Sequence, residues 1–455
     1  MSPKPTGHPR PPSVEAVLRR LRPSVDGADG KLLTGIVRSV IDEERDRLRE
    51  GGTPRDSDAL ADEARDLIRG FEGTGIPSVI NATGVIIHTN LGRAPWPAPV
   101  ARGVADLATD YALLELDRST GRRGPRARVA EDHLVALTGA EDALVTNNNA
   151  AALALAVGLA GRGGIVVSRG ELVEIGGGVR IPEIIRRAGA RLIEVGTTNR
   201  TRAVDFEGPL AEGRARAVLR VHPSNFAMTG FTESPEPASV ADLAHRHGAI
   251  VIDDLGSGAL LDTAAYGLTH EPMPAERLAA GSDVVTFSGD KLVGGPQAGL
   301  VVGRADLIGR MRRDPLARAM RPDKVTLAGV ALTLGLYRAG RAAIDVPVWR
   351  MISMPLDALR VRATAIADAL GSRAAIAELH STVGGGSLPG ETLPSIGLAL
   401  DGGPATTLLA ALRRGDPPLI GRIEDRRVVL DLRTVDPASD PALVRTVLSA
   451  FGARR

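Results

Sequence analysis

A single lysine stands in a glycine-rich, apolar run, FSGDKLVGGPQAGLVVG, which extends over residues 287–303. The chain has 56 lysines and arginines together, yet Lys291 in this run is one of only four lysines. A lysine amine that is partly withdrawn from water has a lowered pKa and becomes nucleophilic, as a Schiff base with the aldehyde of pyridoxal phosphate requires. We expect the small residues after the lysine to let the backbone approach a bound ring. A surface lysine in a turn is the alternative interpretation of this run alone.

Two carboxylates follow a strongly apolar predicted strand upstream of the lysine. Asp253 and Asp254 come directly after AIVI in the run AIVIDDLGSG. A carboxylate at the end of such a strand can pair with the protonated pyridine nitrogen of pyridoxal phosphate and keep the ring an electron sink. A turn or a helix cap would explain either residue on its own.

Three asparagines, Asn147, Asn148 and Asn149, lie between a predicted strand and an alanine-rich predicted helix. Amide groups at a helix N-terminus form an anion site that suits a cofactor phosphate, and the hydroxyl of Ser288 could add a further contact. The order along the chain is an anion loop, then a carboxylate at a strand end, then the lysine. This order resembles that of the fold-type-I pyridoxal-phosphate enzymes.

Other chemistries find little support in the sequence. The chain contains no cysteine, which excludes disulfides, thiolate metal sites and a cysteine nucleophile. No GxxxxGK[ST] run occurs, and His245 and His247 are two residues apart, which does not place them on one helix face as a metal pair; we expect no metal.

Aromatic residues make up only 2% of the chain, which argues against a stacking surface for single-stranded nucleic acid. The longest apolar run, Ala150–Ala160, is too short to span a bilayer, so we expect a cytoplasmic protein.

The 455 residues divide into four segments by composition and pattern. Residues 1–12 are rich in proline and charge, which predicts disorder. Residues 13–75 show only helical periodicity and predict a small helical domain. Residues 76–330 alternate β-rich and helical runs, which predicts a large α/β domain with a mainly parallel sheet flanked by helices, and residues 331–455 predict a smaller α/β domain. The expected strands lie in the runs ALVTN, GIVVSRG, RLIEVGTT, AVLRVH, AIVIDD, DVVTFS and GLVVG in the large domain, and in two runs near residues 395–400 and 427–431 in the smaller one.

Several long strings of the sequence carry a specific resemblance. They are INATGVIIHTNLGRAPW (80–96), VTNNNAAA (145–152), SRGELVEIGGGVRIPEI (168–184), GTTNRT (196–201), VHPSNF (221–226), DLGSG (254–258), FSGDKLVGGPQAG (287–299) and LARAMRPDK (316–324). These strings resemble the bacterial selenocysteine synthases, the L-seryl-tRNA(Sec) selenium transferases. The resemblance covers nearly the whole chain after the first dozen residues and is looser over the opening helical segment.

The resemblance implies a fold-type-I pyridoxal-phosphate enzyme and gives roles to the lysine and to two carboxylates. Lys291 would carry the cofactor, and Asp254 would face the pyridine nitrogen, with Asp253 as its immediate neighbour. Asp290 matches an acidic residue that the family has beside its lysine. Because hydroxide is a poor leaving group, Asp290 and the Lys291 ammonium are both candidates for the general acid.

The family's arginines for the selenium donor fall on Arg93, Arg318 and Arg321. Arginine forks bind an oxyanion bidentately, which a lysine cannot do. Arg318 and Arg321 are three residues apart, so a helix would present both on one face, beside the lysine or beside that of a neighbouring subunit. Ordinary salt bridges would explain each arginine outside this context.

The resemblance implies that serine on tRNA(Sec) is converted to selenocysteine in two steps. Loss of water gives dehydroalanyl-tRNA, and selenophosphate then supplies the selenium. The opening helical domain would bind the tRNA, and the subunits would form homo-oligomers built from dimers, as large as a decamer. A pyridoxal-phosphate lyase acting on a small amino acid or amino sugar is the first alternative, although it would not need the helical domain. A catalytically silent tRNA-binding paralogue is the second, and the presence of Lys291 argues against it.

Overall fold

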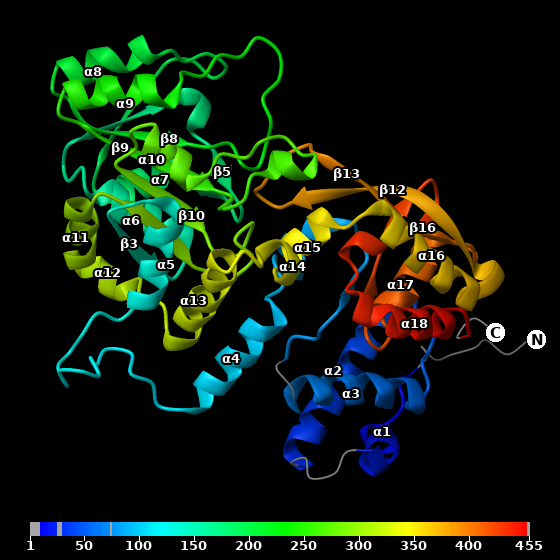
Figure 1. Cartoon of the computed structure of the whole chain (residues 1–455). Coiled ribbons are helices and arrows are strands. Elements are labelled where there is room, and N and C mark those ends of the chain that lie inside the picture. Colours follow the sequence, from blue (N-terminus) through cyan, green and yellow to red (C-terminus); the bar gives the residue numbers. More distant parts are fainter. Residues whose placement is uncertain (1–9, 25–29, 73–74, 453–455) are drawn as a thin grey trace, which may run out of the picture. The chain divides into compact units, whose positions relative to one another are not determined.

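The computed structural model of the chain describes residues 10–24, 30–72 and 75–452 (Figure 1). The chain forms two compact units, Met1–Val79 and Ile80–Arg455. The disorder predicted for the first twelve residues falls mostly outside the described residues, and the three described ones among them adopt no regular structure.

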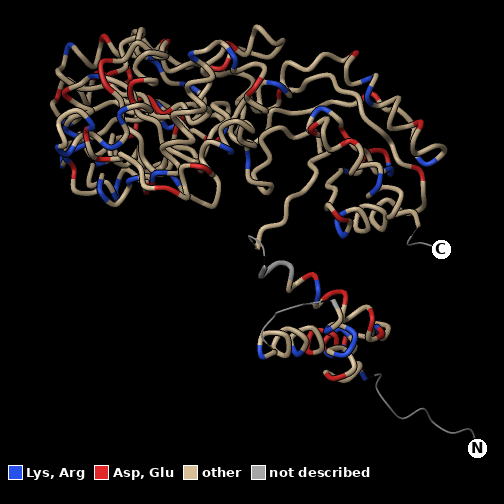
Figure 2. The backbone as a smooth tube through the Cα atoms, turned by 60° about the horizontal axis from the view of Figure 1, so that its bottom comes forward, with Lys and Arg blue, Asp and Glu red and all other residues tan. Residues whose placement is uncertain are grey.

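Three amphipathic helices form the N-terminal unit: α1 (Val14–Leu21), α2 (Gly30–Arg49) and α3 (Ser57–Glu72). Their apolar residues recur every three or four positions and meet in one core. Ser13 caps α1, because its hydroxyl accepts a hydrogen bond from the Ala16 N–H at 3.2 Å. Acidic and basic residues are interspersed along these helices (Figure 2).

A buried carboxylate joins α2 to the segment before α3. The side chain of Glu44 is fully buried, and it accepts hydrogen bonds from Arg47 Nε at 2.8 Å and from Arg55 Nε at 2.7 Å. These guanidinium groups, Arg47 above all, lower the pKa of Glu44 to about 2. A buried carboxylate is stable in a helical core only when it is paired in this way.

A seven-stranded sheet forms the centre of the second unit. β11 pairs antiparallel with both of its neighbours, and all other neighbouring strands pair in parallel. The structure therefore confirms the mainly parallel sheet, and each strand overlaps a run that the sequence predicts as a strand. In spatial order the strands are β3 (Asp142–Thr146), β11 (Gly299–Gly303), β10 (Val284–Ser288), β9 (Ile250–Gly256), β8 (Ala215–Val221), β4 (Gly164–Ser168) and β7 (Arg191–Val195).

Helices cover both faces of this sheet (Figure 1). Successive residues of a strand point to opposite faces, so Val285 packs in the core that includes α13 and Val284 packs in the core that includes α6. The carboxyl ends of the parallel strands lie at one edge, where the connecting loops can carry functional residues. The helices of this part are α4 (Ala98–Thr109), α5 (Arg128–Thr138), α6 (Asn149–Gly158), α7 (Ile181–Arg187), α8 (Glu207–Ala211), α9 (Pro237–Arg246), α10 (Pro274–Ala279), α11 (Ala305–Arg313), α12 (Pro315–Ala319), α13 (Lys324–Arg338), α14 (Ala342–Asp345) and α15 (Pro347–Ser353).

A second, five-stranded sheet is built mainly from the C-terminal segment. The sequence predicts two of its strands, β13 and β16, but not the long β12. In spatial order the strands are β15 (Arg422–Glu424), β16 (Arg427–Asp431), β13 (Thr392–Leu400), β12 (Ala374–Gly384) and β2 (Val85–Ile87), and the helices that pack with them are α16 (Leu356–Leu370), α17 (Ala405–Arg413) and α18 (Asp440–Gly452).

The prediction that residues 76–330 form one domain is wrong at its beginning. β1 (Ile80–Asn81) pairs in parallel with β14 (Leu419–Ile420), and β2 pairs in parallel with β12. The segment therefore completes the C-terminal sheet. Strand partners that lie this far apart in the chain leave no local signal in the sequence.

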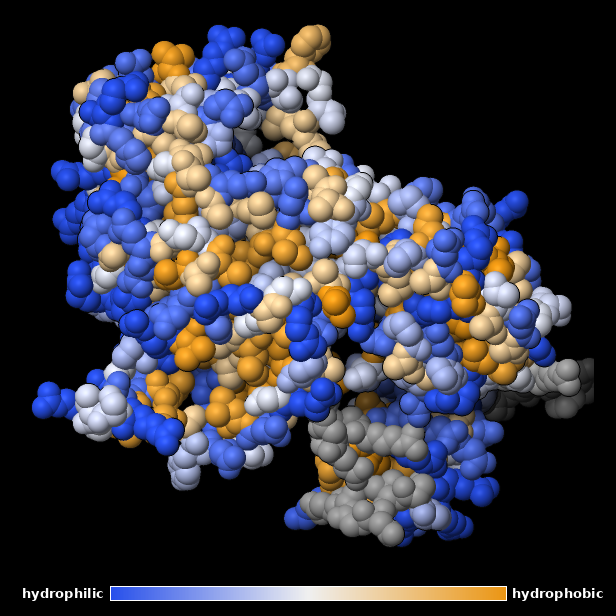
Figure 3. Space-filling view, viewed as in Figure 1, coloured by the Kyte–Doolittle hydropathy of each residue, from blue (hydrophilic) through white to orange (hydrophobic). Residues whose placement is uncertain are grey.

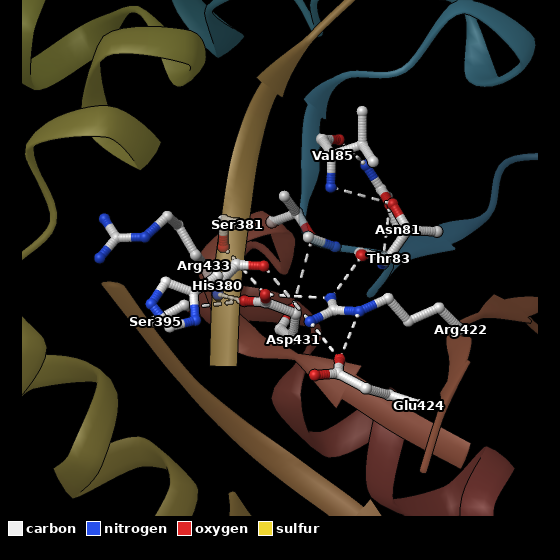
Figure 4. Close-up of polar contacts among 12 residues, drawn as sticks. Asn81, Thr83, Val85, His380, Ser381, Ser395, Arg422, Glu424, Asp431 and Arg433 are labelled. Atoms are coloured by element: carbon white, nitrogen blue, oxygen red, sulfur yellow. Dashed lines mark hydrogen bonds and ion pairs between the residues drawn. The ribbon is translucent and has the colours of Figure 1, made fainter. Parts of the chain in front are cut away.

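A buried polar network explains why the chain carries the string INATG where β1 and β2 meet the C-terminal segment (Figure 4). Asp431 is fully buried in β16, and its carboxylate accepts hydrogen bonds from Ser381 Oγ at 2.9 Å and from Arg422 Nη1 at 3.2 Å. Arg422 Nη1 also donates to the Thr83 carbonyl at 2.6 Å. Gly84 has a φ of 78° and passes so close that a Cβ there would overlap both Asp431 and Arg422. Only glycine fits this position.

Candidate active site

Lys291 lies in the turn after β10, at the carboxyl edge of the central sheet. It lines a cavity of about 260 Å³. The structure brings most of the predicted site residues to this cavity, although they come from distant parts of the chain. Those that line it with Lys291 are Arg93, Asn148, Asn149, Asp254, Ser288 and Asp290.

The environment of Lys291 favours the uncharged amine. Burial lowers the pKa of Lys291, while the carboxylates of Asp254 and Asp290 oppose this effect and the Arg93 guanidinium adds to it. A lowered pKa leaves more of the amine unprotonated at neutral pH. Lys291 is therefore a largely buried residue of this turn and not a surface lysine, and its role in Schiff-base chemistry stays a prediction.

Asp254, and not its neighbour Asp253, lines the cavity with the lysine. Both carboxylates are buried at the end of β9, and burial raises the pKa of each. Asp254 Oδ1 accepts hydrogen bonds from Asn149 Nδ2 and Thr286 Oγ1, each at 2.8 Å. Asp253 Oδ2 instead accepts a hydrogen bond from Ser282 Oγ at 3.2 Å. The alternation of side chains along a strand explains this difference.

The three asparagines have three different places. Asn148 caps α6, because its side-chain oxygen accepts a hydrogen bond from the Ala151 N–H at 2.9 Å. Asn149 uses its amide group to hold Asp254. Asn147 is exposed and does not line the cavity, and its N–H donates to the Met320 carbonyl at 2.9 Å. The expectation that all three gather around one phosphate is therefore wrong for Asn147.

Arg93 and Asp290 form an ion pair, with Arg93 Nη1 2.5 Å from Asp290 Oδ2. Arg93 has a φ of 66°, which is uncommon for a residue other than glycine. Its N–H donates to the His88 carbonyl at 2.9 Å, and this bond helps to hold the unusual conformation. Such conformations cluster at functional sites.

Arg318 and Arg321 do not reach the lysine within one chain. They line a separate cavity of about 240 Å³, where Arg321 Nη1 lies 3.5 Å from Glu115 Oε1. The prediction that one helix presents both arginines is wrong, because α12 ends at Ala319. Arg321 directly precedes Pro322, and the residue before a proline is disfavoured in a helix.

The glycines after the lysine pack against protein and do not line the cavity. A Cβ at Gly294 would lie 2.2 Å from Val346 Cγ1, and a Cβ at Gly295 would lie 3.2 Å from Thr333 Oγ1. The expectation that these small residues let the backbone approach a bound ring stays a prediction. They let the turn pack closely against the helical segment that follows.

Several cavity residues were not predicted from the sequence. His222 is one of them, and its Nε2 lies 3.2 Å from Oε1 of the buried Glu271. The string VHPSNF carries part of the resemblance, but no local pattern in it predicts a role for its residues. Other unpredicted lining residues are Val173, Ser224, Asn225 and Gln297.

The residues of the cavity fit pyridoxal phosphate. Lys291 offers an amine to the aldehyde. Asp254 uses Oδ1 for its two hydrogen bonds to side chains, so Oδ2 can face a ring nitrogen. The N-terminus of α6, capped by Asn148, lies on the same cavity and suits the phosphate. Among the described residues, Asn149 Oδ1 is buried without a hydrogen-bond partner.

Residues 10–24, 30–72 and 75–452 carry neither a candidate metal site nor a candidate membrane-spanning helix. These residues contain no cluster of three or more histidines, aspartates and glutamates that could hold a metal ion. None of the helices they form is both long and apolar enough to cross a membrane.

One solved structure shows the fold. A D-glucosaminate-6-phosphate ammonia-lyase superposes with a TM-score of 0.59 and 21% sequence identity, over 84% of this chain and 98% of that chain. Together with the mainly parallel sheet and its flanking helices, this likeness confirms the fold class expected from the sequence.

Curated relatives match almost the full length of the chain. An L-seryl-tRNA(Sec) selenium transferase of Moorella thermoacetica is 43% identical over 97% of this chain and 96% of the relative. Proteins of the same name from Desulfovibrio desulfuricans and Rhizobium meliloti are 42% and 41% identical, over 97% and 94% of this chain and 97% and 95% of the relatives. The family model described as "SelA: L-seryl-tRNA selenium transferase" matches residues 79–436. The chain belongs to the L-seryl-tRNA selenium transferase family.

Proposed function

We propose that this protein converts L-seryl-tRNA(Sec) to L-selenocysteinyl-tRNA(Sec) with pyridoxal phosphate as its cofactor. One observation carries the proposal: a desolvated Lys291, the buried Asp254 and the N-terminus of α6 meet on one cavity. This cavity lies in a chain whose curated relatives bear the name of that transferase.

The first step removes water from the seryl group. When bound, pyridoxal phosphate supplies an electron sink for the charge left at the serine Cα, and Asp254 holds the ring nitrogen protonated. The Lys291 amine takes the Cα proton, and a general acid protonates the departing β-hydroxyl. The Cα–H and Cβ–O bonds break, water leaves and dehydroalanyl-tRNA remains.

The second step adds selenium to the same carbon. The selenium of selenophosphate forms a bond to Cβ, a proton returns to Cα, and the Se–P bond breaks as water takes up the phosphoryl group. Arg93 contacts Asp290 beside the lysine, and it is the donor-binding arginine that this chain brings to its own cavity. Its guanidinium suits an oxyanion such as the phosphoryl group.

Arg318 and Arg321 act in this proposal at the cavity of a second copy of the chain. Apolar side chains are exposed near their own cavity, with Tyr111 fully exposed and Leu113 60% exposed on the segment that leads to Glu115. Figure 3 shows further apolar residues on the face that carries α4 and α13. Exposed apolar surface of this kind supports a homo-oligomer built from dimers, and a decamer stays a prediction from the resemblance.

Arg318→Ala and Arg321→Ala should each separate the two steps. Elimination of water needs no donor site, so dehydroalanyl-tRNA should still form and be trapped by an added thiol. Charge-assisted hydrogen bonds contribute roughly 1.5–3 kcal/mol each, so selenium incorporation should slow about ten- to a hundredfold. Equal loss of both steps, or of neither, would mean that these arginines are structural.

If each site is built from two chains, an inactive variant and an impaired variant should complement each other. Coexpressed Lys291→Arg and Arg321→Ala chains would form mixed dimers in which one of the two sites keeps both residues. About a quarter of all sites should then be intact, and selenium incorporation should recover to roughly that fraction. If recovery does not occur although mixed dimers form, Arg321 serves the lysine of its own chain.

The N-terminal unit binds the tRNA in this proposal. Deletion of residues 1–75 should weaken tRNA binding at least tenfold, while the visible absorbance of the bound cofactor stays unchanged. Binding by the full chain should also weaken as salt rises, because phosphate contacts release counterions. A duplex RNA is recognised mainly through its shape and backbone, so an unrelated tRNA of different fold is the matched control. Equal affinity of the shortened and full chains for tRNA(Sec) would contradict this assignment.

A spectroscopic experiment tests the proposed function and its alternatives. The purified protein should show the visible absorbance of lysine-bound pyridoxal phosphate, and serine charged on tRNA(Sec), but not free serine, should perturb it. A lyase for small amino acids or amino sugars would respond to the free compound, and a silent paralogue would respond to neither. The cytoplasmic location and selenophosphate as the donor stay predictions.

A further inference from the structure

A glycine of the C-terminal sheet lies directly against the reacting atom of Lys291. A Cβ built on Gly386 would lie 2.6 Å from Lys291 Nζ, 3.0 Å from its Cε and 3.6 Å from its Cδ. Real Cβ atoms do not come closer than 3.0 Å to another heavy atom. Only the absence of a side chain at Gly386 leaves room for the Lys291 amine at this place.

The turn that carries Gly386 is anchored on both sides. Before it, Gly384 pairs with Ile87, and the Gly385 N–H donates to the Ile87 carbonyl at 2.9 Å. After it, Leu388 is 4% exposed and packs in the same core as Phe287 and Leu292, which flank the lysine. Anchored in this way, the backbone at position 386 cannot easily move away from an added side chain.

The polar network around Asp431 supports the same anchoring (Figure 4). Arg422 binds both the Asp431 carboxylate and the Thr83 carbonyl, two residues before β2. β2 is the strand that pairs with β12, and β12 ends at Gly384. A series of contacts thus connects the buried carboxylate of Asp431 to the turn that faces the lysine.

We propose that Gly386 is a positioning residue that acts through Lys291 by fixing the place of its Nζ. This inference rests on the proposed function, in which that amine binds the cofactor and moves the Cα proton. The lysine side chain is flexible and would yield before the backbone does. A methyl group at position 386 therefore displaces the reacting amine while costing the fold little beyond its left-handed conformation.

Gly390 supplies a matched control for the backbone conformation. Gly386 has a φ of 76° and Gly390 a φ of 82°, so an alanine at either position meets the same conformational strain. No atom lies within 4 Å of a Cβ at Gly390. Gly386→Ala and Gly390→Ala should therefore lower the melting temperature alike, and only the first should disturb Lys291.

The test measures pyridoxal-phosphate affinity of the full-length chain after its cofactor has been removed. Gly386→Ala should weaken binding at least about tenfold, and Gly390→Ala less than about threefold, because a covalently held cofactor depends on the position of the amine. In a Lys291→Ala background the two glycine variants should bind the cofactor alike, since no amine remains to be displaced. An equal effect of Gly386→Ala with and without the lysine would overturn the proposal.

A second measurement does not depend on the cofactor. Competitive acetylation of the cofactor-free protein, read by mass spectrometry, gives the reactivity of Lys291 relative to Lys31 and Lys324. Gly386→Ala should change this ratio at least about threefold, and Gly390→Ala should leave it unchanged. An unchanged ratio in both variants would overturn the positioning role, even if the parent protein binds no cofactor and the proposed function has failed.

If Gly386→Ala does not fold, the double variant Gly386→Ala/Lys291→Ala decides the question. Removal of the lysine side chain removes the crowding, so the double variant should fold as Gly390→Ala does. Failure of the double variant to fold would show that position 386 serves the backbone alone.

Discussion

Lys291→Arg should fold and assemble like the parent protein but show neither the visible absorbance of bound cofactor nor turnover. Arginine fills a similar space and places a positive charge beside Asp254 and Asp290, but its guanidinium stays protonated and cannot form a Schiff base. The variant also loses the amine that moves the Cα proton, a contribution of roughly 10²–10⁴-fold by itself. Absorbance spectra and conversion of seryl-tRNA(Sec) measure both effects.

Lys31→Arg is the control for this variant, because it makes the same exchange at an exposed position of α2. It should keep the cofactor band and full activity. Undiminished turnover in Lys291→Arg would contradict the assignment of the cofactor lysine and, with it, the proposed function.

Asp254→Asn should bind the cofactor and lose most of the elimination activity. An asparagine oxygen can still accept the hydrogen bond from Thr286, so the local structure should survive. The neutral side chain no longer holds the ring nitrogen protonated, and a loss of at least about a hundredfold corresponds to about 2.7 kcal/mol in the barrier. Single-turnover formation of dehydroalanyl-tRNA, trapped with a thiol, measures the step.

Asp253→Asn is the matched control, because its carboxylate is equally buried but faces Ser282 on the other side of the strand. This variant should keep elimination activity near that of the parent. The opposite pattern, with activity lost in Asp253→Asn and kept in Asp254→Asn, would show that the neighbouring carboxylate faces the ring.

The parts of the site that lie within single strings could be predicted from the sequence. Lys291 is conspicuous because lysine is rare in a chain that mostly uses arginine. The predicted strand AIVI places a carboxylate at the same edge of the sheet. Both inferences use only local composition and the period of a strand. The large sheet was predictable for the same reason, because its strands are short, apolar runs between helices.

The parts that depend on distant pairing could not be predicted. β2 belongs to the C-terminal sheet because it pairs with β12, and no local pattern in either segment predicts that pairing. Gly386 faces Lys291 only because the pairing of β12 with β2 places the turn after β12 beside the lysine. The separation of Arg318 and Arg321 from the lysine likewise follows from the packing of α12, which sequence spacing does not reveal.

Asn149 illustrates a third case, in which the residue type does not reveal the partner that the side chain has in the structure. An amide at a helix N-terminus is typical of an anion site, yet the Asn149 amide donates to Asp254. The distinction depends on one side-chain orientation, which neither composition nor periodicity determines.

Selenium transfer by the purified protein tests the central claim most directly. Seryl-tRNA(Sec) and selenophosphate should together yield selenocysteine that is esterified to the tRNA. Free serine should not react, and Lys291→Arg should give no product. Absence of selenium from the tRNA while its seryl ester stays intact, or equal conversion of free serine, would contradict the account.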